Sequence, residues 1–167
     1  MGALTFIGVV DGISGISSPD KKYSIQPATW RDLNSLRQVE QACFPVDVWP
    51  LWDLIGVLTM PNVVRLKAVV DERMVGFIAG DMKPVERMAW IVTLGVLPEY
   101  RRLGIGAALL RACESQITFS TIRLNVRISN RAAINLYESF GYQKVGRWPG
   151  YYQDGEEALI MEKQRGW

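Results

Sequence analysis

Apolar residues recur along this chain with two periods, one typical of helices and one typical of strands. Residues 63–70 and 74–82 carry apolar runs on either side of a charged turn, which predicts a hairpin. Residues 122–128 alternate between apolar and polar side chains, which predicts a half-buried strand. We expect further strands at 23–27, 89–96, about 142–148 and about 157–163.

Four other segments have the helical period. Thr29 and Asp32 resemble a capping box at the start of one helix, and Ser129 can cap another, which Gly141 ends in a left-handed conformation. The pattern predicts a single α/β (α+β) domain over residues 23–167, with a mixed, central antiparallel sheet of about seven strands flanked by about four helices. The expected helices span residues 33–42, about 50–59, about 104–115 and 130–140.

Residues 1–22 are rich in Gly, Ser and Ile and fit neither period well. They lack the basic start that is typical of a secretory signal. We expect a flexible or loosely docked leader. The alternative is an additional element that covers an edge or an interface.

Composition narrows the function classes. The 167 residues suffice for one domain with a substantial core. The net charge of +2 gives no argument for a nucleic-acid or anionic membrane partner, and no apolar run approaches the ~20 residues that a membrane span needs. Cys43 and Cys113 have the spacing of neither a disulfide framework nor a metal site. We therefore expect a cytoplasmic protein without a bound metal.

Residues 94–110 carry the clearest chemical signal. They predict a strand, a basic turn with Gly104 and Gly106, and then a helix. The free N–H groups at the start of a helix bind anions, and glycines let a phosphate approach the backbone. A P-loop motif is absent, and Leu109 stands where a dinucleotide fingerprint needs its third glycine. The turn therefore predicts another phosphate-bearing cofactor.

The pattern Arg101-x-x-Gly104-x-Gly106 resembles the pyrophosphate signature of the GNAT family of acetyl-CoA-dependent N-acetyltransferases. On its own, the turn also fits a basic loop that caps an ordinary helix. Three further segments match the family in order along the chain, and two of them resemble its protein N-terminal acetyltransferase branch. They are the helix and Gly-Tyr of residues 129–142, the closing hairpin with Tyr151-Tyr152-x-Asp154-Gly155, and the peptide-facing loop with Phe44-Pro45-Val46 and Trp49.

The resemblance implies acetyl-CoA as cofactor. It also implies a bulge at Gly95 that splays two strands, where backbone N–H groups hold the acetyl carbonyl and the pantetheine arm. A glycine that merely accommodates packing is the alternative. The cofactor-binding residues implied are Leu94, Val96, Arg101, Arg102, Leu103, Gly104, Ile105, Gly106, Ala107, Asn130 and Tyr137, and Gly95 is placed with the catalytic residues.

Tyr137 has the position of the family's general acid toward the coenzyme A sulfur, although its helical spacing also fits core packing.

The residues at the general-base positions differ from those of the family. Bacterial ribosomal-protein alanine acetyltransferases carry Glu at the position of Asn125, and the eukaryotic enzyme for Met-starting N-termini carries His there with Tyr at the position of Trp90. This chain has no histidine, and neither Asn125 nor Trp90 takes up a proton at neutral pH. Asn125 acting through a water, and the carboxylates of Asp154, Glu156 and Glu157, remain open alternatives.

The missing base favours one class of acceptor. A free α-amine has a pKa of about 7.7–8.0, against about 10.4 for lysine, so far more of it is neutral near pH 7.5. The aromatic residues of two loops are expected to clasp the first residues of a peptide. The substrate-binding residues implied are Phe44, Pro45, Val46, Trp49, Trp90, Val92, Tyr151 and Tyr152.

Together these features predict an acetyltransferase that acts on the α-amine of a protein or peptide N-terminus. Neither cysteine lies in a nucleophile motif, so we expect direct attack of the amine in a ternary complex with acetyl-CoA. The alternatives are a small-molecule amine N-acetyltransferase and a non-catalytic acetyl-CoA-binding module.

Overall fold

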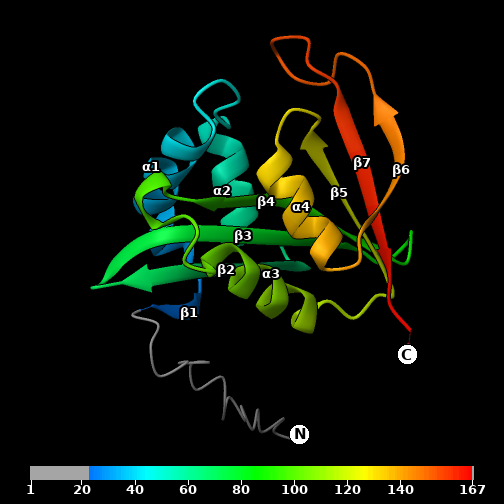
Figure 1. The fold of residues 1–167 in the computed structure, drawn as a ribbon. Helices are drawn as coiled ribbons and strands as arrows, with labels where there is room; N and C mark the ends of the chain where they lie inside the picture. Colours follow the sequence, from blue (N-terminus) through cyan, green and yellow to red (C-terminus); the bar gives the residue numbers. More distant parts are fainter. Residues whose placement is uncertain (1–22, 167) are drawn as a thin grey trace, which may run out of the picture.

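The computed structural model describes residues 23–166. In this part of the chain, seven strands form one sheet in the order β1-β2-β3-β4-β5-β7-β6 (Figure 1). Strands β4 and β5 run parallel, and the other neighbouring strands run antiparallel. The predicted mixed sheet is confirmed. The strands are β1 (Ser24–Pro27), β2 (Val63–Val70), β3 (Arg73–Lys83), β4 (Met88–Val96), β5 (Thr121–Arg127), β6 (Gln143–Trp148) and β7 (Ala158–Gln164).

Four α-helices within residues 23–166 cover the two faces of the sheet, as predicted (Figure 1). Helices α1 (Leu33–Cys43) and α2 (Leu51–Thr59) lie on one face, and α3 (Ile105–Gln116) and α4 (Arg131–Ser139) lie on the other. Short 3-10 turns precede α1 and α3 as η1 (Trp30–Asp32) and η2 (Pro98–Tyr100). None of the helices in residues 23–166 is long and apolar enough to cross a bilayer.

The helix ends follow local chemistry. The backbone N–H of Thr29 donates to the carboxylate of Asp32 at 2.8 Å, which forms the predicted capping box around η1. Gly141 has φ +88° after α4, as its left-handed role required. The prediction that Ser129 caps α4 is wrong. Asn130 is the cap, because its side-chain oxygen accepts the backbone N–H of Ala133 at 3.1 Å.

Side chains from both helical layers bury the central strand β3. Leu36 and Leu54 are buried on one side, and Leu109 and Leu110 are buried on the other. Burying a leucine side chain stabilises a fold by about 1.5–3 kcal/mol. The central strands are therefore held between two packed layers, and the site is built on a rigid base.

A bulge interrupts β4. Ala79 of β3 pairs with Thr93, and the adjacent Gly80 pairs with Ile91, so Val92 has no partner in β3. The prediction of a bulge at Gly95 is wrong in position, because Gly95 pairs regularly with Phe77. Gly95 is instead closely packed against the end of α1. A Cβ at this position would lie 3.2 Å from the sulfur of Cys43.

The bulge coincides with the end of pairing between β4 and β5. Their parallel register runs from Met88 opposite Thr121 to Ile91 opposite Leu124 and stops there. Beyond this point the two strands continue without pairing to each other. The loop between α1 and α2 and the loop between β6 and β7 lie at this same end of the molecule, at the top of Figure 1.

Candidate active site

A cavity of about 750 Å³ lies where β4 and β5 separate. Both strands, helix α4, the α1–α2 loop and the β6–β7 loop contribute to its walls. The structure therefore brings together the residues that sequence reasoning assigned to substrate binding and catalysis, Gly95 excepted. The assigned residues that line the cavity are Phe44, Pro45, Val46, Trp49, Trp90, Val92, Leu94, Asn125, Asn130, Tyr137, Tyr151 and Tyr152.

Residues 101–107 lie outside the cavity lining, where residues 101–104 form the basic turn after η2 and residues 105–107 begin α3. Gly104 is the N-cap of α3 and has φ +78°, and Arg102 has φ +64°. The first helical bond runs from Ala108 to Gly104, and the N–H groups of residues 102–107 have no acceptor within residues 23–166. This row of free donors fits a pyrophosphate. The side chain of Arg101 instead donates to the carbonyl of Val96 at 3.0 Å and so anchors the turn to β4.

The backbone of β4 also presents polar groups to the gap. The backbone N–H of Leu97 donates to the carbonyl of Val75 in β3 at 2.9 Å, so the backbone of Leu97 faces β3. Alternate residues of a strand direct their N–H and C=O groups to opposite sides. The backbone groups of Leu94 and Val96 therefore face the gap, whereas those of Gly95 face β3.

Tyr137 reaches the cavity from α4 and is otherwise buried. Its ring packs edge-on against Tyr142, with 5.7 Å between the ring centroids. Burial raises the pKa of the Tyr137 phenol well above its usual value. The hydroxyl therefore stays protonated through the neutral pH range and can donate a hydrogen bond.

Asn125 points into the cavity from β5 with one unused polar atom. Its Nδ2 donates to the hydroxyl of Tyr151 at 3.4 Å, and its buried Oδ1 has no partner within residues 23–166. A buried acceptor without a partner is costly in an apolar surrounding. The Asn125 amide is therefore left with unused hydrogen-bonding capacity in the cavity wall.

Stacked aromatic rings form one wall of the cavity. Trp90 lies parallel to Trp148 with centroids 6.3 Å apart, and Trp148 stacks on Tyr151 at 5.4 Å. Tyr151 meets the edge of Tyr152 at 5.0 Å. Sequence reasoning missed Trp148, because its partners come from other segments of the chain. The stack carries the wall from β4 to the β6–β7 loop.

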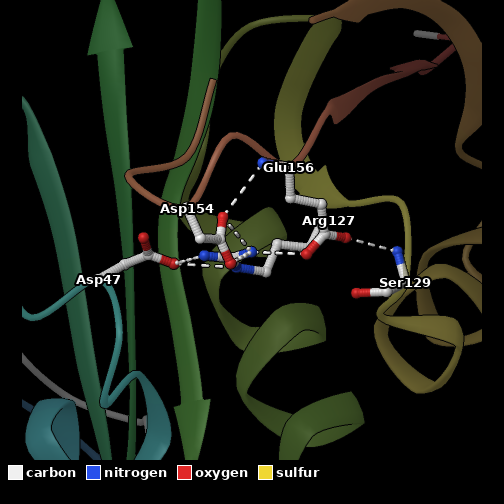
Figure 2. Close-up of polar contacts among 5 residues, drawn as sticks. All are labelled: Asp47, Arg127, Ser129, Asp154 and Glu156. Atoms are coloured by element: carbon white, nitrogen blue, oxygen red, sulfur yellow. Dashed lines mark hydrogen bonds and ion pairs between the residues drawn. The ribbon is translucent and has the colours of Figure 1, made fainter. Parts of the chain in front are cut away.

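Arg127 at the end of β5 joins both loops (Figure 2). It donates through Nε and Nη2 to Asp47 of the α1–α2 loop, at 2.9 and 2.5 Å. Its Nη1 contacts Asp154 at 2.9 Å and Glu156 at 2.6 Å, both in the β6–β7 loop. Sequence reasoning missed this contact and noted Arg127 only as a polar position of the alternating strand.

These contacts change the acidity of two carboxylates that sequence reasoning left open as bases. The Arg127 guanidinium lowers the pKa of Asp154, and hydrogen bonding to Ser129 and to Arg127 lowers the pKa of Glu156. The third, Glu157, pairs with Arg147 at 3.2 Å. Weakly basic, ion-paired carboxylates are poor proton acceptors near neutral pH.

Glu40 is a buried acid that sequence reasoning also missed. It lies on α1 one turn before Cys43, and one carboxylate oxygen accepts the hydroxyl of Thr93 at 2.9 Å. The other oxygen is buried without a partner within residues 23–166. Burial raises the pKa of Glu40 to about 7.

No group of three or more potential metal ligands occurs in residues 23–166.

Known proteins resemble this chain in sequence and fold. An N-alpha-acetyltransferase of Sulfurisphaera tokodaii is 30% identical over 155 residues, which cover 84% of this chain and 92% of the relative. The ribosomal-protein-S18-alanine N-acetyltransferase of Escherichia coli has a TM-score of 0.77 and 27% identity, covering 87% of this chain and 95% of its own. Naa50 of Arabidopsis thaliana, in complex with the bisubstrate analogue CoA-Ac-MVNAL, has a TM-score of 0.73 and 26% identity, covering 86% and 99%.

The family model of the acetyltransferase (GNAT) family matches residues 30–142. This range includes the basic turn, the diverging strands and the helix with Tyr137. Acetyl-CoA is the cofactor of this family, and the free backbone donors of residues 102–107 fit its pyrophosphate. The chain belongs to the GNAT family and is an acetyl-CoA-dependent acetyltransferase.

Proposed function

We propose that this enzyme transfers an acetyl group to the α-amine of a protein or peptide N-terminus, by direct attack in a ternary complex. The observation that carries the proposal is the cavity between the two loops, with aromatic walls and with Tyr137 at its side. The relatives named as N-alpha-acetyltransferases support it, as does the likeness to Naa50 with its peptide-bearing analogue. The two free cysteines favour a cytoplasmic setting.

Direct attack is supported by the state of the cysteines. Cys43 lines the cavity, but burial raises the pKa of its thiol. Cys113 is fully buried, and burial raises the pKa of its thiol to about 12. Neither thiol is a thiolate near neutral pH, so neither is suited to carry the acetyl group. The amine itself is then the nucleophile.

The acetyl oxygen and the leaving sulfur each face a group that can stabilise the charge developing on them. Acetyl-CoA, when bound, supplies the thioester whose acetyl group is transferred. The backbone N–H groups of Leu94 and Val96 face the gap and can stabilise negative charge on the acetyl oxygen. The hydroxyl of Tyr137 lies at the cavity, where it can hydrogen-bond the departing sulfur and pass its proton to the thiolate as negative charge develops there.

The amine loses its proton without a strong base. Asn125 lines the cavity, and its side-chain amide can orient a water that passes this proton to solvent. An amine that is already partly neutral at the working pH needs little further deprotonation before it can attack. About a quarter to two-fifths of α-amines are neutral at pH 7.5, against roughly a thousandth of lysine side chains. The site is therefore matched to an N-terminus rather than to a lysine.

A coenzyme A release assay with paired peptides tests the proposal. Each sequence carries either a free N-terminus or a blocked N-terminus with an internal lysine, and the pH is varied from about 6.5 to 9. We expect turnover only on free N-termini, rising with pH as an α-amine titrates. Turnover on the blocked peptide would identify a lysine acetyltransferase. Turnover on neither, with acetyl-CoA still bound, would favour a small-amine enzyme or a binding module.

A further inference from the structure

Arg127 connects parts of the chain that are distant in sequence. Asp47 lies 80 residues before it, and Asp154 and Glu156 lie 27 and 29 residues after it. All four side chains meet at one point between the α1–α2 loop and the β6–β7 loop (Figure 2). These are the same two loops that border the proposed amine site.

The chemistry of this contact depends on a guanidinium. Its Nε and Nη2 share one oxygen of Asp47, while Nη1 serves both acids of the other loop. The guanidinium carbon also lies 4.0 Å from the ring centroid of Tyr152. A lysine ammonium lacks the planar fork that this arrangement uses. Without a cation, three carboxylates would repel one another across the mouth of the cavity.

The contact also reaches the helix that carries Tyr137. Glu156 accepts the backbone N–H of Ser129 at 2.9 Å, just before the Asn130 cap of α4. The β6–β7 loop is therefore positioned against both Arg127 and the start of α4. Two loops and one helix take their relative positions from one cluster of ion pairs and hydrogen bonds.

We infer that Arg127 is a positioning residue that joins the two loops and fixes the width of the slot through which an extended peptide enters. For the peptide this inference rests on the proposed function, whereas the joining of the loops does not. An extended chain contacts both loops at once, so its binding depends on their separation. A compact amine enters the cavity without spanning the loops and depends on it far less.

Hydrogen exchange tests the joining of the loops without any substrate. The amides of Asp47, Tyr152 and Gly155 are hydrogen-bonded within their loops and serve as reporters. In Arg127→Met we expect exchange about tenfold faster in both loops. The matched control is Arg147→Met, since Arg147 pairs with Glu157 within the β6–β7 hairpin and forms no ion pair with another loop in residues 23–166. Faster exchange in one loop alone, or equal acceleration in the control, would overturn the inference.

Asp47→Asn is a milder change. It removes the ion pair between Arg127 and the α1–α2 loop and leaves Arg127 paired with Asp154 and Glu156. We expect faster exchange at Asp47's own loop and little change at Tyr152 and Gly155. An unchanged exchange rate in the α1–α2 loop of this variant would contradict the inference, even if Arg127→Met failed to fold.

Kinetics then test the effect on the substrate. For Arg127→Met we expect the KM of a free-N-terminus peptide to rise about tenfold, with kcat within about threefold and coenzyme A affinity unchanged. Turnover of a single amino-acid amide should change little, and Arg127→Lys should recover part of the peptide KM. A fall in kcat at unchanged KM would refute positioning. If the wild-type enzyme ignores peptides, the proposed function fails, and the exchange experiment still decides whether Arg127 joins the loops.

Discussion

Glu40 and Thr93 join α1 to β4 through one buried hydrogen bond of 2.9 Å. The contact lies next to the bulge, and the free oxygen of Glu40 is enclosed without a partner in residues 23–166. The folded state therefore favours the neutral form of this acid. Its pKa of about 7 lies well above the ordinary value of 4.5.

This pKa predicts how stability changes with pH. A carboxyl whose pKa is raised by folding contributes fully below its unfolded pKa of about 4.5, and the contribution is lost as pH rises through about 7. Charging Glu40 should lower the free energy of unfolding by about 3 kcal/mol above pH 7. Glu40→Gln should remove this loss, as measured by urea unfolding near pH 5 and pH 8. The exposed Glu86→Gln is the control, and equal pH dependence in wild type and Glu40→Gln would contradict the assignment.

Tyr137→Phe tests the proposed acid. Because the hydroxyl of Tyr137 lies at the cavity, its loss should lower kcat by about a hundredfold, within the range of general acid catalysis. The ring still packs against Tyr142, so we expect the acetyl-CoA affinity and the melting temperature to stay close to wild type. Single-turnover kinetics and calorimetric binding measure the two effects separately. An unchanged kcat would exclude Tyr137 as the acid.

Gly95→Ala tests whether this glycine serves packing. Its methyl group would lie 3.2 Å from the sulfur of Cys43 and 3.3 Å from the ring of Phe44, which should destabilise the fold by about 1–3 kcal/mol. The double variant Gly95→Ala with Cys43→Ala should recover part of this loss, because it removes the sulfur. Denaturant unfolding of the single and double variants gives the coupling free energy. Strictly additive losses would speak against the contact.

Cys43→Ala alone should keep kcat within about threefold, because we propose that the amine attacks directly. The thiol lines the cavity but is held protonated by burial. Intact-mass measurement after mixing enzyme with acetyl-CoA should detect no acetylated Cys43. Loss of turnover, or a trapped acetyl group on this residue, would instead indicate a covalent route.

Asn125→Glu should add the missing base. A carboxylate at this position would lie in the cavity wall beside Tyr151, where the amine is proposed to lose its proton. We expect kcat/KM near pH 6.5 to rise about tenfold or more, because few α-amines are neutral at that pH. At pH 9 the variant and the wild type should converge. Identical pH profiles would mean that the proton leaves by another path.

Much of the fold could be predicted from the sequence because its information is local. The alternation of residues 122–128 and the charged turn after Val70 depend on neighbours in the chain, and both form as predicted. The basic turn with Gly104 is equally local, and its left-handed N-cap matches the glycine requirement.

The bulge could not be predicted from the same signals. Ala89, Ile91, Thr93 and Gly95 are buried at every second position without interruption. Yet Ile91 pairs with Gly80 and faces α3, whereas Thr93 faces Glu40 of α1. The alternation continues through the bulge because both faces of β4 are covered. Only the register with β3 reveals that the side chains exchange faces.

The contacts of Arg127 and Trp148 were missed for a related reason. The polar position of Arg127 is what a solvent-facing strand residue would also show. Its three carboxylate partners come from two loops, and nothing in their spacing selects them. Trp148 similarly gains its role from Trp90 and Tyr151. Such long-range pairs become visible only when the chain is folded.

The extra residue in β4 has a consequence for how this site can vary. Removing Val92 would leave Ile91 and Thr93 on the faces they now occupy, since β3 already pairs with them as neighbours. It would, however, remove the local bend and allow β4 to continue pairing with β5 past Leu124. The separation of β4 from β5 thus depends on the number of residues in one strand rather than on their identity. Substitutions along β4 would change the side chains at the gap, whereas a one-residue deletion would close the gap between β4 and β5.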